Sequence, residues 1–164
     1  MNSLLLHIIN SLLPIIPETR GFAVKRFLFK LAGANIGRNV RICSSVRIIG
    51  AGMLTIGDNT WVGHRTLIVA SSMIKIGNNV DIAPNVFIGN GTHEITPERD
   101  KIADIELSKD IVIGDGCWLC VNSTILPGVT IGSKCVVAAG SVVTKSFDDK
   151  LLIAGVPAVT KKNL

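Results

Sequence analysis

The sequence contains no tyrosine, and aromatic residues make up only 4% of its 164 positions. Charged residues are also sparse at 18%, whereas hydrophobic residues reach 48% and glycine occurs 16 times. So little charge combined with so many apolar residues excludes a disordered chain and a long charged coiled coil. The length predicts one domain, whose core must consist mainly of small branched aliphatic side chains.

Cysteine is scarce as well. Four cysteines are too few for a disulfide scaffold in a chain of this length, so we expect a reducing, cytoplasmic location. Cys117 and Cys120 have the spacing of a zinc or redox pair, but no second pair or nearby histidine completes a ligand set. We therefore interpret the cysteines as packing residues and expect no bound metal.

Acidic residues are fewer than basic ones, 12 against 17, which gives a net charge of +5. This balance suits an anionic small molecule, an anionic membrane surface or a nucleic acid. The basic residues are not interleaved with stacking aromatic residues, so we expect no nucleic-acid partner.

The first sixteen residues, MNSLLLHIINSLLPII, are apolar but too short to span a bilayer. They predict a short helix over Ser3–Leu13, followed by a second, amphipathic helix over Glu18–Leu31 with one solvated face. Gly33 is expected to end the second helix. Residues 1–33 thus form a helical cap on the body of the protein or a peripheral contact with the inner face of a membrane. The pattern leaves both interpretations open.

From residue 36 onward, an aliphatic residue recurs at every sixth position. A period of six fits neither an α-helix nor one long alternating strand, but it fits a solenoid in which three hexads close a triangular coil. Within most hexads a second position is small or β-branched, and glycine, asparagine or aspartate is placed to relieve the corners. The aliphatic positions are Ile36, Ile42, Ile48, Ile56, Val62, Ile68, Ile76, Ile82, Ile88, Ile113, Leu119, Ile125, Ile131, Val137 and Val143.

The fold class predicted from these repeats is an all-β solenoid of about five triangular coils, preceded by the short α-helical segment. The coils occupy residues 34–147, and residues 148–164 are expected as a C-terminal tail. Residues 90–110 interrupt the hexads and must loop out of the prism. Long loops on rigid scaffolds usually serve binding or catalysis.

These repeats resemble those of the hexapeptide-repeat acyltransferases, whose fold is a left-handed parallel β-helix. The resemblance covers about residues 36–157 and supplies the handedness, which the repeat arithmetic does not fix.

The residues Gly91, Thr92, His93 and Glu94 at the root of the loop are similar to the His-bearing loop of the galactoside, maltose and polysaccharide O-acetyltransferase branch. The resemblance implies that His93 is the general base, and a largely neutral imidazole can accept a hydroxyl proton. Glu94 orients His93, contacts the acceptor or is simply solvated. His64 either contacts the acceptor or is a surface residue.

The C-terminal coils are similar to the acetyl-CoA segment of the same branch, through the runs AAGSVVTK at 138–145 and AGVPA at 154–158. The resemblance implies acetyl-CoA as the donor substrate. It also implies donor contacts at Val121, Ala139, Thr144, Lys145 and Lys162, of which Val121 lies near the thioester and Lys162 near the 3′-phosphate. Two departures stand out, because Gly63 and Ser71 occupy positions where sugar-acetylating relatives carry an asparagine and an aspartate for acceptor hydroxyls.

The sequence therefore predicts an acetyl-CoA-dependent O-acetyltransferase that acts by direct transfer on a hydroxyl of a sugar or polysaccharide precursor. The resemblance implies a homotrimer with sites between neighbouring prisms. Three alternatives differ in chemistry: N-acetylation of an amino sugar, a non-catalytic solenoid scaffold, and a carbonic-anhydrase-like metalloenzyme. The last would need three histidines per site, whereas only His64 and His93 lie within the coils.

Overall fold

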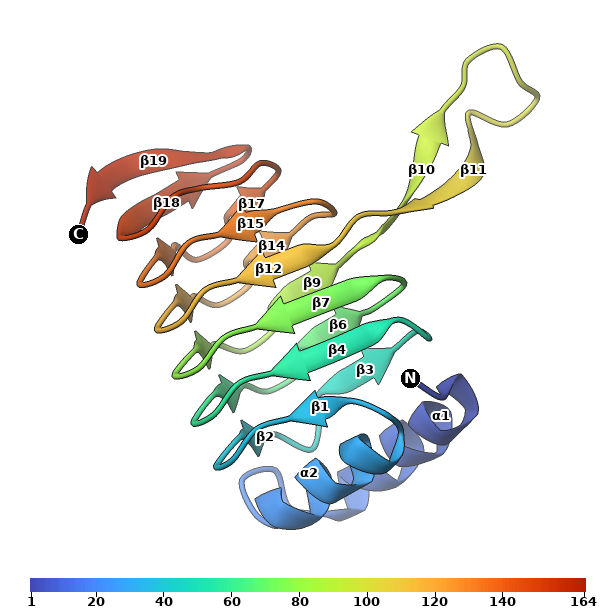
Figure 1. The fold of residues 1–164 in the computed structure, drawn as a ribbon, viewed down its shortest axis with the longest axis vertical. Helices are drawn as coiled ribbons and strands as arrows, with labels where there is room; N and C mark the ends of the chain where they lie inside the picture. The colour runs from blue at the N-terminus through green and yellow to red at the C-terminus, as the bar shows by residue number, and fades with distance from the viewer.

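The computed structural model describes residues 1–164 as a three-sided, left-handed parallel β-helix with two helices across its first coil (Figure 1). The expected fold class is confirmed. Five coils contribute a strand to each of three sheets, and β18 adds a sixth coil to one of them. Successive coils pair in parallel, twenty residues apart at Ile36 and Ile56 and eighteen apart at Ile113 and Ile131.

Each sheet forms one face of the prism, and we name the faces sheets A, B and C in the order in which the chain enters them. Sheet A contains β1 (Asn35–Ile36), β4 (Met53–Ile56), β7 (Met73–Ile76), β12 (Ile111–Ile113) and β15 (Thr130–Ile131). Sheet B contains β2 (Arg41–Ile42), β5 (Trp61–Val62), β8 (Asp81–Ile82), β13 (Trp118–Leu119), β16 (Val136–Val137), β18 (Leu151–Gly155) and β19 (Ala158–Asn163). Sheet C contains β3 (Arg47–Ile49), β6 (Leu67–Val69), β9 (Phe87–Gly89), β14 (Thr124–Ile125) and β17 (Val142–Val143).

The interior of the prism is filled as the hexads predict. All fifteen aliphatic residues of the pattern are buried, each at most 1% exposed. The small or β-branched position is buried along the coils as well, with Cys117 and Cys135 stacked in neighbouring coils. The prism is too narrow for many aromatic side chains, which explains their scarcity in the sequence.

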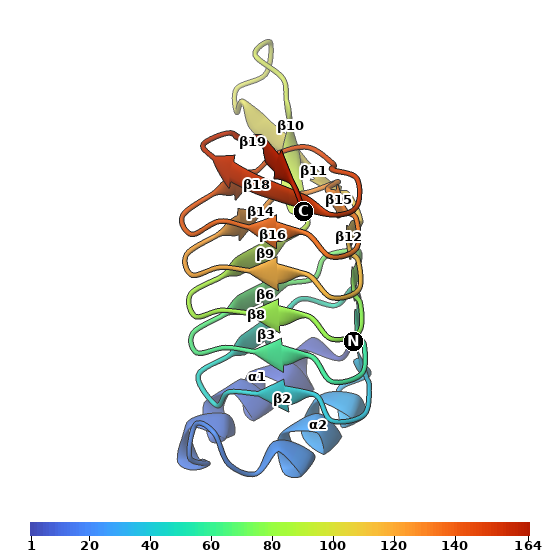
Figure 2. The same cartoon turned by 90° about the vertical axis from the view of Figure 1, so that its left-hand side faces the viewer.

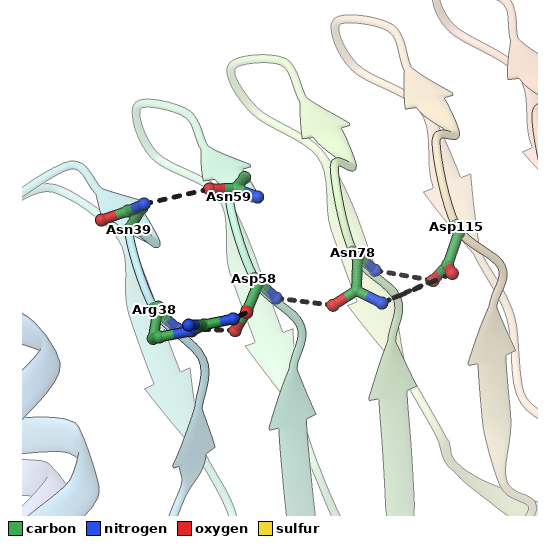
Figure 3. A network of polar contacts seen from close by, with 6 residues as sticks. All are labelled: Arg38, Asn39, Asp58, Asn59, Asn78 and Asp115. Carbon is green, nitrogen blue, oxygen red and sulfur yellow. Dashed lines mark hydrogen bonds and ion pairs between the residues drawn. The ribbon is translucent and has the colours of Figure 1, made fainter.

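Asparagine and aspartate line the corner between sheets A and B. Figure 3 shows a ladder in which Asp58 accepts from Arg38, Asn78 accepts from the Asp58 backbone, and Asp115 accepts from Asn78. Glycine precedes this ladder because neighbouring coils touch there: a Cβ on Gly57 would lie 2.6 Å from the backbone of the next coil. The corner chemistry expected from the sequence is therefore confirmed.

Two helices lie across the open end of the first coil (Figure 2). Helix α1 (Ser3–Leu12) begins at Asn2, whose side chain accepts from the backbone of Leu5, and continues into a 3₁₀ turn, η1 (Leu13–Ile15). Helix α2 (Phe22–Leu31) is shorter than expected. No helix in the structure has both the length and the apolar character needed to cross a bilayer.

The expected start of the second helix at Glu18 is wrong, and the reason is local. Gly21 at the N-cap has a left-handed backbone with φ of +62°, so the helix begins only after it. The Glu18 carboxylate is instead held by the backbone and hydroxyl of Ser45 in the first coil. Gly33, with φ of +91°, ends the helix as expected.

Residues 148–164, treated as a tail on sequence grounds, contain β18 and β19. Strand β18 pairs in parallel with β16, and β19 folds back antiparallel on β18. The β18–β19 pair thus extends sheet B beyond the fifth coil.

Candidate active site

Residues 90–110 leave the prism after β9 as a two-stranded antiparallel hairpin of β10 (Gly91–Ile95) and β11 (Ala103–Ser108). Figure 1 shows this hairpin projecting away from the coils at the corner where the chain passes from sheet C to sheet A. An ion pair of 2.8 Å between Arg99 and Asp104 closes its outer part. The interruption in the hexads therefore marks a structured element, and His93 lies near its root.

Asn90 fastens the root of the hairpin, a role that the sequence analysis missed. Its fully buried side chain accepts from the backbone of Ser71 at 2.7 Å and of Ser72 at 3.3 Å. The same side chain donates to the Ser72 hydroxyl at 2.8 Å and to the Met73 carbonyl at 3.1 Å. Its backbone carbonyl accepts from Lys109, which returns from the hairpin. A polar residue directly where the hexads stop is the signal that could have identified it.

His93 lines a hollow of about 260 Å³ at this root. The imidazole-bearing residue is exposed, so it is accessible to a substrate rather than held in a packed core. The hollow is formed by both hairpin strands and by the corner of the second coil: Ser71, Gly91, Thr92, His93, Glu106, Leu107 and Ser108. Polar groups dominate this lining, so it offers hydrogen-bond donors and acceptors to a ligand.

The acidic residue that shares the hollow with His93 is Glu106. It is the direct cross-strand partner of His93, and residues so paired have Cβ atoms about 5 Å apart on the same face. Glu94, the expected neighbour, follows His93 on the same strand, where successive side chains point to opposite faces. It does not line the hollow. Only the hairpin register reveals Glu106, because it lies thirteen positions after His93 in the chain.

Four of the residues expected to contact acetyl-CoA have a free backbone N–H group. The N–H groups of Val121, Ala139, Thr144 and Lys145 donate no hydrogen bond within the chain. Val121 and Ala139 belong to stacked turns between sheets B and C, since the N–H of Gly140 donates to the Val121 carbonyl at 3.0 Å. All four residues are exposed, so these amides are open to a ligand.

Thr144 and Lys145 follow β17, the outermost strand of sheet C. Like the hairpin, they lie where the chain passes from sheet C to sheet A. The Lys145 ammonium is 5.7 Å from the centre of the Phe147 ring. Lys162 is exposed on β19 opposite Leu152. His93 and Val121, by contrast, lie beyond opposite ends of the neighbouring strands β9 and β14.

His64 lies elsewhere, at the turn between β5 and β6. Its Nδ1 is 3.3 Å from a carboxylate oxygen of Glu18, which joins the segment between α1 and α2 to the second coil. Burial opposes ionisation of Glu18, but hydrogen bonds from Ser45 and the nearby His64 lower the pKa of this carboxyl overall. His64 is therefore a tether of the helical segment, separate from the hollow.

Glu18, Cys43 and His64 also form a group whose potential ligand atoms lie within 4.8 Å of one another. Burial raises the pKa of Cys43 to about 11, which favours the neutral thiol over the metal-binding thiolate. The buried Lys25 amine lies near this thiol as well, and burial lowers the pKa of that amine. The trio acts as packing and tethering residues in this structure.

Two family profiles match the chain: bacterial transferase hexapeptide (six repeats) over residues 110–145, and hexapeptide repeat of succinyl-transferase over residues 53–90. WcaF of Escherichia coli K12, named for a colanic acid biosynthesis acetyltransferase, is 38% identical over 135 residues, 82% of this chain and 72% of WcaF. The chain belongs to the hexapeptide-repeat acetyltransferase family. It is similar to the surface-polysaccharide and galactoside branch of that family, as expected from the sequence.

Other members of the hexapeptide-repeat acetyltransferase family support this placement. The galactoside O-acetyltransferase of Escherichia coli K12 is 35% identical over 130 residues, 79% of this chain and 64% of that enzyme. A hexapeptide-repeat acetyltransferase of Vibrio cholerae, solved with acetyl coenzyme A, superposes with a TM-score of 0.76 at 25% identity. That match covers 99% of this chain and 86% of the Vibrio protein. The expected enzyme class, acyltransferase, is confirmed by this family.

Proposed function

We propose that the chain transfers an acetyl group from acetyl-CoA to a hydroxyl of a sugar unit in a surface polysaccharide or its precursor. Relatives named for colanic acid and galactoside acetylation, and a relative solved with acetyl coenzyme A, support the donor and the acceptor class. The observation that carries the proposal is the exposed His93 in a polar hollow at the root of a rigidly fastened hairpin. A scaffold protein would have no need for this arrangement.

The reaction is a direct transfer with His93 as general base. The neutral imidazole takes the proton of the acceptor hydroxyl while the oxygen attacks the thioester carbonyl. The resulting tetrahedral intermediate collapses with cleavage of the carbon–sulfur bond, and the imidazolium returns its proton to the thiolate of CoA. Glu106 acts as a positioning residue, because a carboxylate across the hairpin from His93 favours the imidazolium that forms during the reaction.

The donor lies along the free backbone amides of Val121, Ala139, Thr144 and Lys145. The pantetheine arm carries amide carbonyls that accept from such N–H groups, and the Val121 amide supports the developing oxyanion. Lys162 offers charge to the 3′-phosphate. These roles use backbone donors that the coils leave unsatisfied at their turns and at the outer edge of sheet C.

The complete site needs two copies of the chain. A sheet C strand of three residues spans about 10 Å, and His93 and Val121 lie beyond its two ends. A homotrimer of prisms packed side by side would bring His93 of one copy against the Val121 corner of the next. The exposed apolar side chains of Ile95 and Ile102 on the hairpin are consistent with packing on such a neighbour.

The decisive experiment measures thiol release from acetyl-CoA over a panel of sugars and nucleotide sugars. His93→Ala is expected to lower turnover on the order of a hundredfold or more while acetyl-CoA binding is retained. His7→Ala, which removes another exposed imidazole on α1, is the matched control and should leave turnover unchanged. Turnover that survives His93→Ala would refute the general base. Amino sugars in the same panel distinguish O-acetylation from N-acetylation.

A further inference from the structure

Helix α2 buries a basic residue beside the buried Phe29 and leaves apolar residues exposed on its outer face. Its inner face contains Lys25, which is fully buried and whose Nζ donates to the carbonyls of Pro17 at 3.3 Å and Glu18 at 2.7 Å. Its outer face, half a turn away, carries Phe27 at 59% exposure and Leu31 at 56%. The expectation of a single basic, solvated face is therefore wrong. Surface helices normally turn such a row toward the core.

Helix α1 also leaves an apolar row uncovered. Leu6 and Ile9 pack on the first coil, whereas Leu4, Ile8 and Leu12 are exposed at successive turns. Ile15 in η1 extends this row. Both helices lie at one end of the prism, across its first coil (Figures 1 and 2), so this end presents two apolar rows outward. We call α1, η1 and α2 together the helical end.

The charge of the chain is concentrated at the same end. Residues 1–57 contain seven lysines and arginines and a single acidic residue, Glu18, whereas the remainder has ten basic and eleven acidic residues. The whole net positive charge therefore belongs to the helices and the first coil. Five of these seven basic residues are exposed, and one of them, Arg38, is paired with Asp58 at 2.9 Å. The exposed basic residues without such a pairing are Arg20, Lys30, Arg41 and Arg47. Glu18 is occupied by Ser45 and His64.

We propose that the helical end binds the surface of an anionic phospholipid bilayer, with the outer rows of α1 and α2 buried among the headgroups. Apolar rows flanked by lysine and arginine, without acidic residues in the helices, are the properties that hold amphipathic helices at such a surface. A second copy of the chain is a poorer partner, because two positively charged ends would repel each other. The inference is independent of the acetyl-transfer chemistry.

The experiment is co-sedimentation of the full chain with vesicles of phosphatidylcholine alone or with phosphatidylglycerol added. We expect binding to the anionic vesicles that weakens with added salt. Phe27→Ser combined with Leu31→Ser is expected to lower the partition coefficient about tenfold or more, since each side chain loses its transfer into the apolar boundary. Lys30→Glu combined with Arg20→Glu is expected to lower binding to anionic vesicles by a similar factor.

Matched controls lie far from the helical end. Val159→Ser with Leu164→Ser removes two exposed apolar side chains near the C-terminus, and Lys134→Glu with Lys161→Glu reverses two exposed charges elsewhere. Both controls should bind as the unaltered chain does, with folding verified by circular dichroism. The proposal is overturned if the folded chain ignores anionic vesicles, or if the helical variants bind as the controls do. It is also overturned if light scattering shows that Phe27→Ser with Leu31→Ser dissociates the oligomer, because a second copy would then cover this face.

Discussion

The buried titratable residues of this chain differ from the candidate site residues, which lie at exposed corners of the prism. Burial raises the pKa of the Cys43 and Cys117 thiols to about 11 and lowers the pKa of the Lys25 amine. Burial thus favours the neutral forms of the two thiols inside the prism and of the Lys25 amine on the inner face of α2. His93 and the free amides, in contrast, are exposed to ligand.

The cysteines provide a test at this scale. With the pKa raised from 9.0 to about 11, a thiol has about a hundredfold less thiolate at pH 8, and the thiolate is the form that is alkylated. Iodoacetamide added to the native protein at pH 8 should therefore modify the half-buried Cys120 first and Cys43 and Cys117 last. Peptide mass spectrometry follows the order, with the protein unfolded in urea as the control. Rapid labelling of Cys43 in the native state would contradict the burial described above.

The elements of the fold differ in how far the sequence predicts them. Strands repeat one contact, an aliphatic residue pointing into a narrow prism, so Ile36 and every later member of the pattern reveal the coils. The face of α2 toward the coil does not follow from the sequence, because two carbonyls of the preceding segment, rather than hydrophobicity, hold Lys25 inward.

The same distinction applies to the candidate site. His93 is identified by the motif at the loop root, whereas Glu106 depends on the hairpin register and Asn90 on contacts with the second coil. Long-range pairings of this kind are set by tertiary structure, and no local period records them. The roles of Val121, Ala139, Thr144, Lys145 and Lys162 stay predictions.

The attachment of the β10–β11 hairpin to the coils depends on Asn90. Asn90→Ala removes four side-chain hydrogen bonds to part-buried groups of residues 71–73, so we expect a loss of about 2–4 kcal/mol in the free energy of unfolding. Turnover should fall as well, since His93 loses its anchored strand. Urea unfolding measures the first effect. Asn35→Ala, at an exposed position of β1 without side-chain hydrogen bonds, is the control and should change stability by less than about 0.5 kcal/mol. Equal stability of the two variants would show that the root is fastened by other contacts.

At the scale of the whole molecule, the proposed site is shared between copies, which makes it open to complementation. His93→Ala and Ala139→Trp each remove a different half of the site. Co-expressed, the two inactive chains should form mixed trimers in which about a quarter of the interfaces combine an intact His93 with an intact donor corner. Acetyl-transfer activity should then return to about that fraction of the unaltered level. Activity that stays absent in demonstrably mixed trimers would place both halves within one chain.

The number of stacked coils also fixes the distance between the helical end and the hairpin that carries His93. Coils advance by about 4.8 Å each, so two steps, about 10 Å, separate the coil beneath α1 and α2 from the third coil, after which the hairpin emerges. Removal of one complete 20-residue repeat between them would move the His93 imidazole about 5 Å closer to the helical end and leave it at the same corner of the prism. The separation between the helical end and His93 is therefore fixed in whole-repeat steps of about 5 Å.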